Sequence, residues 1–98
     1  MTLRITDAAE SDIEAAIGWY TERSMEAGLA FASKLRLALE HVEQYPLSGR
    51  SIDNEVRRFL VKDFPYLVIY RLLPPDQTPE VFVLLHTSRA PDSWRERG

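Results

Sequence analysis

Hydrophobic residues recur at helical spacing in the first half of the chain. One stripe contains Ile13, Ala16, Ile17 and Tyr20. It predicts a helix over about 8–22, with Asp7 as its N-cap and Glu10 completing a capping box. A second stripe contains Phe31, Leu35, Ala38, Leu39 and Val42. It predicts a helix that starts at 25 or 26 and ends at Tyr45-Pro46, because the residue before a proline avoids the helical conformation. The short gap between the two predicts an antiparallel hairpin.

The second half of the chain changes to the patterns of β-strands. Residues 56–62 alternate, whereas residues 66–73 and 80–86 are apolar at nearly every position. Residues 2–6 suit a short strand, and the turn formers of 47–55 predict a loop. The expected fold is therefore α+β: an N-terminal strand, an antiparallel helical hairpin and a three-stranded antiparallel meander.

The two central strands are apolar on both faces, yet two helices cover only one face of a sheet. An uncovered apolar face in a small protein indicates a protein partner that docks an amphipathic segment there. We assign this free face to side chains that share one side of the predicted strands: Leu60, Tyr66, Val68, Tyr70 and Leu72.

Composition narrows the classes of function. The 98 residues fit one domain, which we place at 1–98. The chain has no cysteine, which excludes disulfides and thiolate zinc sites. The net charge of −3 argues against a general nucleic-acid binder. Without a signal peptide or an apolar run near twenty residues, we expect a cytoplasmic protein with no membrane contact.

The C-terminal stretch 86–97 holds the candidate chemistry. Its functional side chains are His86, Arg89, Trp94, Arg95 and Arg97. Trp94 either folds back on Tyr20 or Trp19 or is an exposed anchor for a target. Arg89 either contacts a target or pairs with Asp92 or with acids of the first helix.

His86 and His41 are the only histidines. His86 is a candidate general base, and its alternative role is to hold the tail at a strand end through backbone hydrogen bonds. We favour the second role because no carboxylate or nucleophile stands at a useful offset. His41, between acids on the second helix, is expected to be solvated, and we expect no metal site.

Four stretches, taken in order, carry a resemblance to a known family. They are DIEAAIGWY (12–20), GLAFASKLRLALEHVEQYPLSGR (28–50), VRRFLVKDFPYLVIYRLL (56–73) and HTSRAPDSWRER (86–97). Together they resemble toxins of the RelE/ParE superfamily, most closely the ParE branch. The resemblance implies a toxin of a type II toxin–antitoxin system, wrapped by a small antitoxin. ParE-like members poison DNA gyrase, and RelE-like members cut mRNA in the ribosome.

The resemblance also implies which side chains a ribonuclease of this superfamily would need. Arg58 matches one cation of the sheet and Arg89 matches the C-terminal arginine. Leu60 and Leu67 stand where further cations are expected, and Trp94 stands near the expected tyrosine. An indole cannot transfer a proton at neutral pH, so most of the catalytic set is missing.

We therefore predict a non-enzymatic toxin that inhibits DNA gyrase and is held inactive by a ParD-like antitoxin, without cofactors. Target contacts are expected from Arg89, Trp94, Arg95 and Arg97, and antitoxin contacts from the free sheet face. No sequence-specific nucleic-acid binding is expected of the chain alone. Two alternatives stay open: a ribosome-dependent mRNA interferase that uses Arg58, Arg89 and His86, and an antitoxin-binding module without toxicity.

Overall fold

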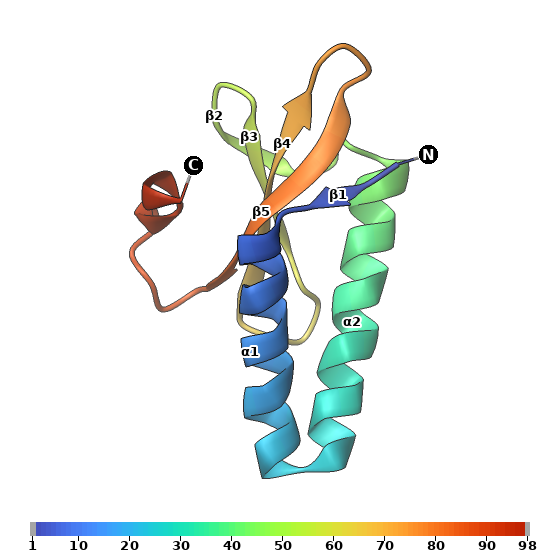
Figure 1. The fold of residues 1–98 in the computed structure, drawn as a ribbon, viewed down its shortest axis with the longest axis vertical. Helices are drawn as coiled ribbons and strands as arrows, with labels where there is room; N and C mark the ends of the chain where they lie inside the picture. The colour runs from blue at the N-terminus through green and yellow to red at the C-terminus, as the bar shows by residue number, and fades with distance from the viewer. Residues whose placement is uncertain (1, 98) are drawn as a thin grey trace.

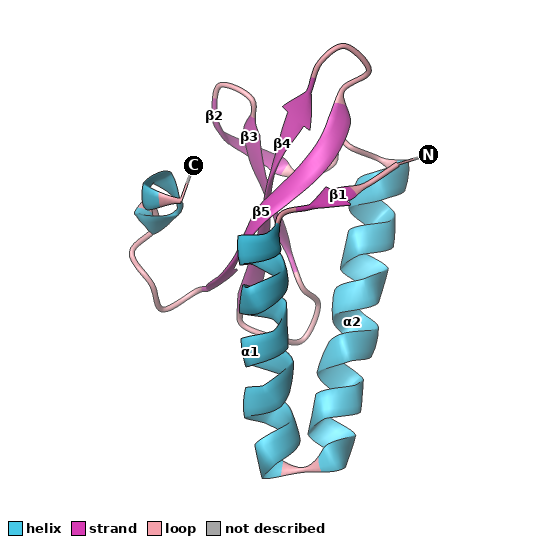
Figure 2. Cartoon of the chain, viewed as in Figure 1, coloured by secondary structure: helices cyan, strands magenta, loops and turns pink. Residues whose placement is uncertain are grey.

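A computed structural model describes residues 2–97 of the chain. Two helices form a hairpin that packs on one face of a five-stranded sheet (Figures 1 and 2). The elements, in chain order, are β1 Arg4–Ile5, α1 Asp7–Arg23, α2 Met25–Gln44, β2 Arg50–Asp53, β3 Val56–Leu60, β4 Tyr66–Leu73, β5 Thr78–His86 and the 3₁₀ helix η1 Ser93–Glu96. The predicted α+β class and helical hairpin are confirmed.

Hydroxyl side chains cap both helices of the hairpin. The Thr6 hydroxyl accepts a hydrogen bond from the backbone N–H of Ala9 at 3.1 Å, so Thr6 is the N-cap and Asp7 is the first helical residue. The prediction of Asp7 as N-cap was wrong by one position. Ser24 ends α1 and also caps α2, where its hydroxyl accepts from Ala27 N–H at 2.9 Å. One residue therefore makes the whole turn between the helices.

The strands lie in the order β1-β5-β4-β3-β2. The predicted meander of β3, β4 and β5 is present, and β1 adds to it in parallel with β5. The prediction of a loop over 47–55 was wrong, because residues 50–53 form β2 and pair antiparallel with β3. β2 is short and largely exposed, so its polar sequence lacks the alternation that marks a half-buried strand.

The main core lies between the sheet and the hairpin. Val68, Tyr70 and Leu72 of β4 are buried there against α2 residues such as Phe31 and Leu35. Tyr66 packs partly buried against the same cluster. The prediction that these β4 side chains lie on the free face was wrong, because they lie under the helices. Alternation separates the two faces of a strand, but it does not tell which face the helices cover.

The opposite face of the sheet has its own apolar cluster, formed by Ile69, Phe82, Val83, Leu85 and Trp94. The pairing of Ile69 with Val83 and of Tyr70 with Val81 leaves Phe82 as an extra residue in β5. This β-bulge breaks the alternation and puts Phe82 and Val83 on the same face.

Trp94 of η1 covers this second cluster, 7% exposed and edge-on to Phe82 with ring centroids 6.2 Å apart. The tail does fold back onto the protein, which was one of the two alternatives for Trp94. It folds onto the second sheet face, and not onto Tyr20 or Trp19. The role of an exposed anchor is excluded for Trp94 in this structure.

Candidate functional site

A groove runs along the second sheet face beside the tail. Its volume is about 610 Å³. Its floor is apolar and includes Ile52, Leu60, Leu67, Ile69 and Leu85, and its rim carries Arg50, Arg58, Arg89 and Arg95. We call it the arginine-rimmed groove. Leu60, which is 56% exposed, is the one predicted antitoxin contact that lines it.

Two rim arginines stand directly opposite each other. Arg50 of β2 is the register partner of Arg58 of β3. Like charges at opposed positions of an antiparallel pair destabilise the sheet. Within residues 2–97, no carboxylate lies within ion-pair distance of Arg50, Arg58 or Arg89. The groove therefore combines an apolar floor with cations that lack an internal counter-charge.

The loop before β2 is fixed by a buried tyrosine. The Tyr70 hydroxyl donates to the Pro46 carbonyl at 2.7 Å and accepts from Gly49 N–H at 3.0 Å. Arg57 donates to the carbonyls of Leu47 and Gly49 at 3.2 and 2.8 Å. A Cβ at position 49 would overlap the Tyr70 hydroxyl, so glycine is required there. This network holds the chain just before Arg50 and thereby sets the start of β2.

The other side of the groove is closed by Arg95. Its guanidinium donates to the Asp53 carboxylate at 2.7 Å and lies 4.6 Å from the centroid of the Trp94 ring. The hydrogen bond from Arg95, together with one from Asn54 N–H, lowers the pKa of Asp53. The ion pair thus ties the tail to β2, and the cation–π contact holds the same guanidinium over Trp94 within the tail.

Arg97 ties the tail to α1 and to the exposed edge of β5. It donates to both carboxylate oxygens of Asp12, at 3.0 and 3.1 Å, and to the Phe82 carbonyl at 3.0 Å. Asp12 also accepts from Leu84 N–H at 3.0 Å. β1 is too short to pair with this part of β5, so the two side chains satisfy backbone groups that a neighbouring strand would otherwise bind. The hydrogen bond with Asp12 raises the pKa of Arg97.

A second hollow, of about 630 Å³, lies between α1 and the tail. It is lined by residues that include Trp19, Tyr66, His86, Arg89 and Ser93. His86 Nδ1 accepts from Ser88 N–H at 3.0 Å, and its ring meets Tyr66 edge-on at 5.0 Å. These contacts match the tail-holding alternative for His86. Arg58 lies in the arginine-rimmed groove and His86 in this hollow, with Arg89 lining both.

The predicted site residues therefore separate into two groups. Trp94 is buried, and Arg95 and Arg97 are engaged in ion pairs. Arg89 is exposed and lines both hollows. Sequence analysis missed Asp12, Asp53 and Arg50. Arg50 ends the segment Pro-Leu-Ser-Gly-Arg (46–50), which lies in a stretch that carries the family resemblance and was a signal for it. Nothing local marks Asp12 as a partner of a residue 85 positions away.

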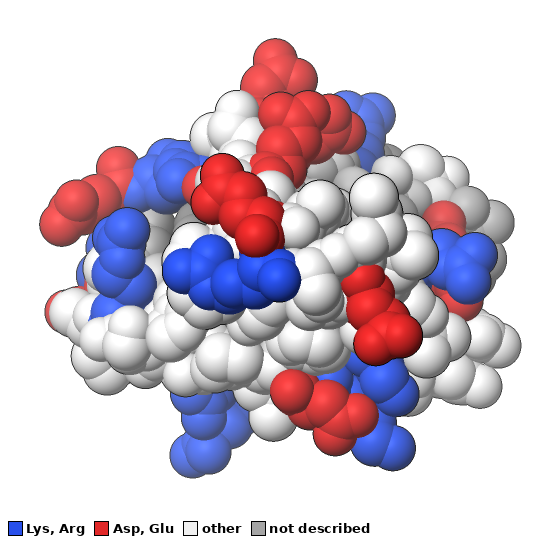
Figure 3. Space-filling view, turned by 90° about the horizontal axis from the view of Figure 1, so that it is seen from below, with Lys and Arg blue, Asp and Glu red and all other residues white. Residues whose placement is uncertain are grey.

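Residues 2–97 show neither a metal site nor a membrane-spanning helix. No group of three or more histidines and carboxylates is arranged to hold a metal ion. Neither helix combines the length and apolar character that a membrane crossing requires. Seen from the tip of the hairpin, acidic and basic side chains are mixed over the surface (Figure 3).

Comparison with known proteins gives a family. A family model described as the ParE toxin of the type II toxin–antitoxin system parDE matches residues 3–91. A solved chain from the chromosomal ParDE TA system of P. aeruginosa has the same fold, with a TM-score of 0.74 and 18% sequence identity. The match covers 88% of this chain and 95% of that chain. No curated protein is similar at a significant level.

Proposed function

Because the chain belongs to the ParE toxin family of type II toxin–antitoxin systems, in the RelE/ParE superfamily, we propose that it inhibits DNA gyrase and is neutralised by a ParD-like antitoxin. The inhibition is by binding, without cleavage of nucleic acid, and takes place in the cytoplasm. The observation that supports this most directly is the arginine-rimmed groove.

The groove has the properties expected of a surface for a protein segment. Leu60, Leu67, Ile69 and Leu85 provide an apolar floor for one side of an amphipathic segment. Three rim arginines, Arg50, Arg58 and Arg89, have no carboxylate partner within residues 2–97. Acidic residues on the same segment would gain planar, bidentate contacts there. We assign antitoxin binding to this groove, in place of the β4 residues that lie under the helices.

The arrangement offers little for ribonuclease chemistry. Cleavage needs a cation and an acid–base group on the same phosphate. Arg58 and His86 lie in separate hollows, and His86 Nδ1 is already occupied by Ser88 N–H. Among the residues that line the arginine-rimmed groove, Asp92 carries the only carboxylate, and none is a histidine. The geometry therefore favours a non-enzymatic toxin over a ribonuclease.

The target contact is proposed for the same groove. Of the four predicted target residues, Arg89 is exposed and has no ion-pair partner among residues 2–97, and Arg50 and Arg58 lie on the same rim. If gyrase and the antitoxin bind overlapping parts of this rim, antitoxin binding neutralises the toxin by occupying its contact surface.

The test is a supercoiling assay with purified gyrase and the full chain released from its antitoxin complex. The wild-type chain should inhibit supercoiling, and added antitoxin should restore it. Arg58→Glu and Arg89→Glu should each weaken inhibition at least tenfold. Arg4→Glu is a matched control because Arg4 is exposed on β1, at the opposite edge of the sheet.

Pulse labelling after induction without antitoxin separates the alternatives in cells. DNA synthesis should fall before protein synthesis. If protein synthesis falls first and cleaved mRNA accumulates, the chain is an mRNA interferase. If neither falls while the antitoxin still binds, the chain is a binding module.

A further inference from the structure

α2 and the loop directly after it carry most of the large exposed hydrophobic side chains in the described part of the chain. Seven such side chains are exposed in the described part of the chain, and five belong to α2 or to the loop directly after it. These five are Met25, Leu29, Leu37, Tyr45 and Leu47. Isolated exposed hydrophobics are ordinary on protein surfaces, but a row of them along one helix is a feature of interfaces.

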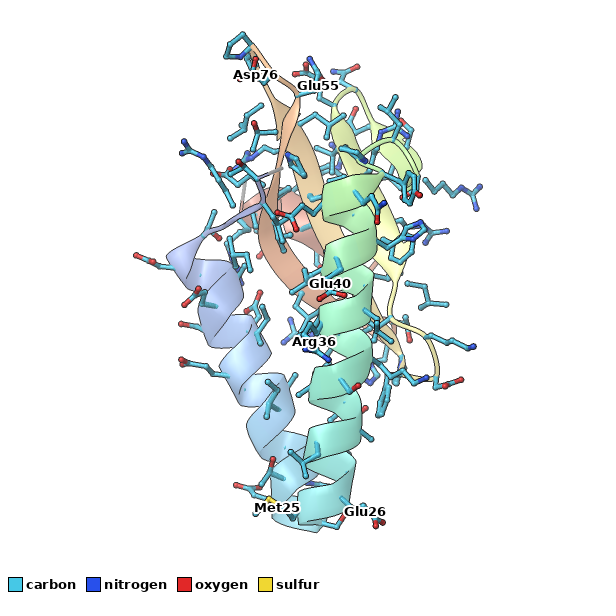
Figure 4. The ribbon with its side chains drawn as sticks, turned by 90° about the vertical axis from the view of Figure 1, so that its right-hand side faces the viewer. Met25, Glu26, Arg36, Glu40, Glu55 and Asp76 are labelled. Carbon is cyan, nitrogen blue, oxygen red and sulfur yellow. The ribbon has the colours of Figure 1, made fainter. Side chains whose placement is uncertain are left out.

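The row follows from the helical positions. Leu29, Ser33 and Leu37 recur every fourth residue, on the side of α2 opposite the buried Phe31, Leu35, Ala38 and Val42. Arg36 and Glu40 are both exposed on α2, and Figure 4 shows Arg36 at the edge of the helix that faces α1, where it lines a shallow hollow with Glu10 and Glu14. α2 therefore presents an uncovered face with leucines and two opposite charges.

The charges on this face complement a second copy of the same face. In an antiparallel pair of α2 helices whose two-fold axis passes near position 38, Arg36 of each copy meets Glu40 of the other. The same register leaves the two copies of Leu37 offset by only about 3 Å along the helix axes, one on each side of the two-fold axis. Within residues 2–97, neither Arg36 nor Glu40 lies within ion-pair distance of an opposite charge.

The same register also brings apolar surfaces of the two copies together at the ends of the paired helices. Leu29 of one copy is placed opposite residues 45–47 of the other. A shallow apolar hollow lies there, about 540 Å³ in volume and lined by His41, Tyr45, Pro46 and Leu47 among others. Leu29 is 65% exposed and provides a side chain for that hollow. Apolar and charged contacts thus select one and the same alignment.

We propose that the chain self-associates through α2, as an antiparallel two-fold dimer centred near position 38. A single helix pair buries less than the roughly 800 Å² per partner of a standard interface, so the dimer forms in the micromolar range of concentration. α2 lies on the sheet face opposite the arginine-rimmed groove, so a dimer leaves both grooves open.

The first test is sedimentation of the full chain, separated from antitoxin, from nanomolar to high micromolar concentration. The mass should rise from 11.3 kDa toward twice that value. Arg36→Glu and Glu40→Arg should each weaken dimerisation at least tenfold, and the double exchange should restore it. Asp76→Lys, a charge reversal in the turn before β5, should have no effect (Figure 4).

A second readout is needed because Arg36→Glu also adds an acid beside Glu10 and Glu14 of α1. Since the chain has no cysteine, introduced cysteines report contacts directly. Leu37→Cys should form a disulfide-linked dimer on mild oxidation, and Leu29→Cys alone should not. A mixture of the Leu29→Cys and Leu47→Cys chains should cross-link between the two variants.

Three results would overturn the proposal. One is a monomeric mass at every concentration. Another is a dimer that the charge reversals leave unchanged. The third is an increase in mass only when antitoxin is added, which would make the antitoxin the occupant of this helix face.

Discussion

At the scale of single residues, the Tyr70 hydroxyl connects the core to the loop before β2. It satisfies two backbone groups, the carbonyl of Pro46 and the N–H of Gly49. We expect Tyr70→Phe to lower the free energy of unfolding by about 2 kcal/mol, because both groups lose a partner in a buried setting. Chemical denaturation measures this. Tyr45→Phe, at an exposed tyrosine, should change stability by less than about 0.5 kcal/mol, and an equal loss in both variants would contradict the assignment.

Asp53 provides a prediction about pH. Its hydrogen bond with Arg95, followed by that with Asn54 N–H, lowers its pKa below the ordinary value. A carboxyl group with a lowered pKa in the folded state stabilises the fold above its unfolded-state pKa and stops doing so as the pH falls through the folded-state pKa. We therefore expect the tail to loosen from β2 in acid, below the ordinary range of aspartate titration.

An NMR titration of the Asp53 side chain measures the effect directly. Arg95→Ala should return the pKa of Asp53 toward its ordinary value, while Arg97→Ala, which removes the other tail ion pair, should leave it low. An unchanged pKa in Arg95→Ala would show that the Asn54 N–H bond alone lowers it.

At the scale of elements, α1 and α2 approach each other closely at Gly28. A Cβ there would overlap the Thr21 hydroxyl, which is held by a 2.7 Å hydrogen bond to the Ile17 carbonyl. Alanine is the better helix former by about 1 kcal/mol, yet we expect Gly28→Ala to destabilise the protein by about 1–3 kcal/mol through overpacking. Thermal unfolding followed by circular dichroism measures the change.

Gly18 of α1 is the matched control. A Cβ at Gly18 would meet no atom within 4 Å, so Gly18→Ala should stabilise the protein by up to about 1 kcal/mol. Thr21→Ala combined with Gly28→Ala should recover most of the lost stability. A loss that persists in the double variant would place the clash elsewhere.

The elements differ in how far the sequence predicted them. Stripes such as Ile13 to Tyr20 and the apolar run 66–73 predicted both helices and the central strands, because burial imposes a period on them. β2 was not predicted, because a short, half-exposed edge strand has no such period. The assignment of the free face failed for two reasons: the bulge at Phe82 breaks alternation, and no local pattern tells which side of β4 the helices cover.

The candidate site was predicted in part for the same reason. Arg58 and Arg89 were found because both lie in stretches that carry the family resemblance and match positions where the superfamily has cations. The ion pair of Asp12 with Arg97 joins the first helix to the last described residue, and such a contact has no signature in the sequence. Long-range pairs of this kind are a property of the fold.

At the scale of the whole molecule, Trp94 closes the second sheet face. We expect Trp94→Ala to lower the free energy of unfolding by about 3 kcal/mol, because it uncovers Ile69, Phe82, Val83 and Leu85. The variant should also bind a hydrophobic dye more strongly than the wild-type chain does. Trp19→Ala is the control, since Trp19 is 48% exposed and should matter much less. Equal dye binding by both variants would contradict a covering role for Trp94.

The contacts between the N-terminal and C-terminal parts of the chain also affect when the fold can be completed during synthesis. Arg4 pairs in parallel with Glu80, and Arg97 binds Asp12, so both contacts need residues that the ribosome makes after the helical hairpin. The helical hairpin leaves the ribosome well before the strand and tail that complete its environment. A nascent chain that lacks β5 and the tail therefore has no finished arginine-rimmed groove, and the partner binding proposed for that groove must wait until both have been made.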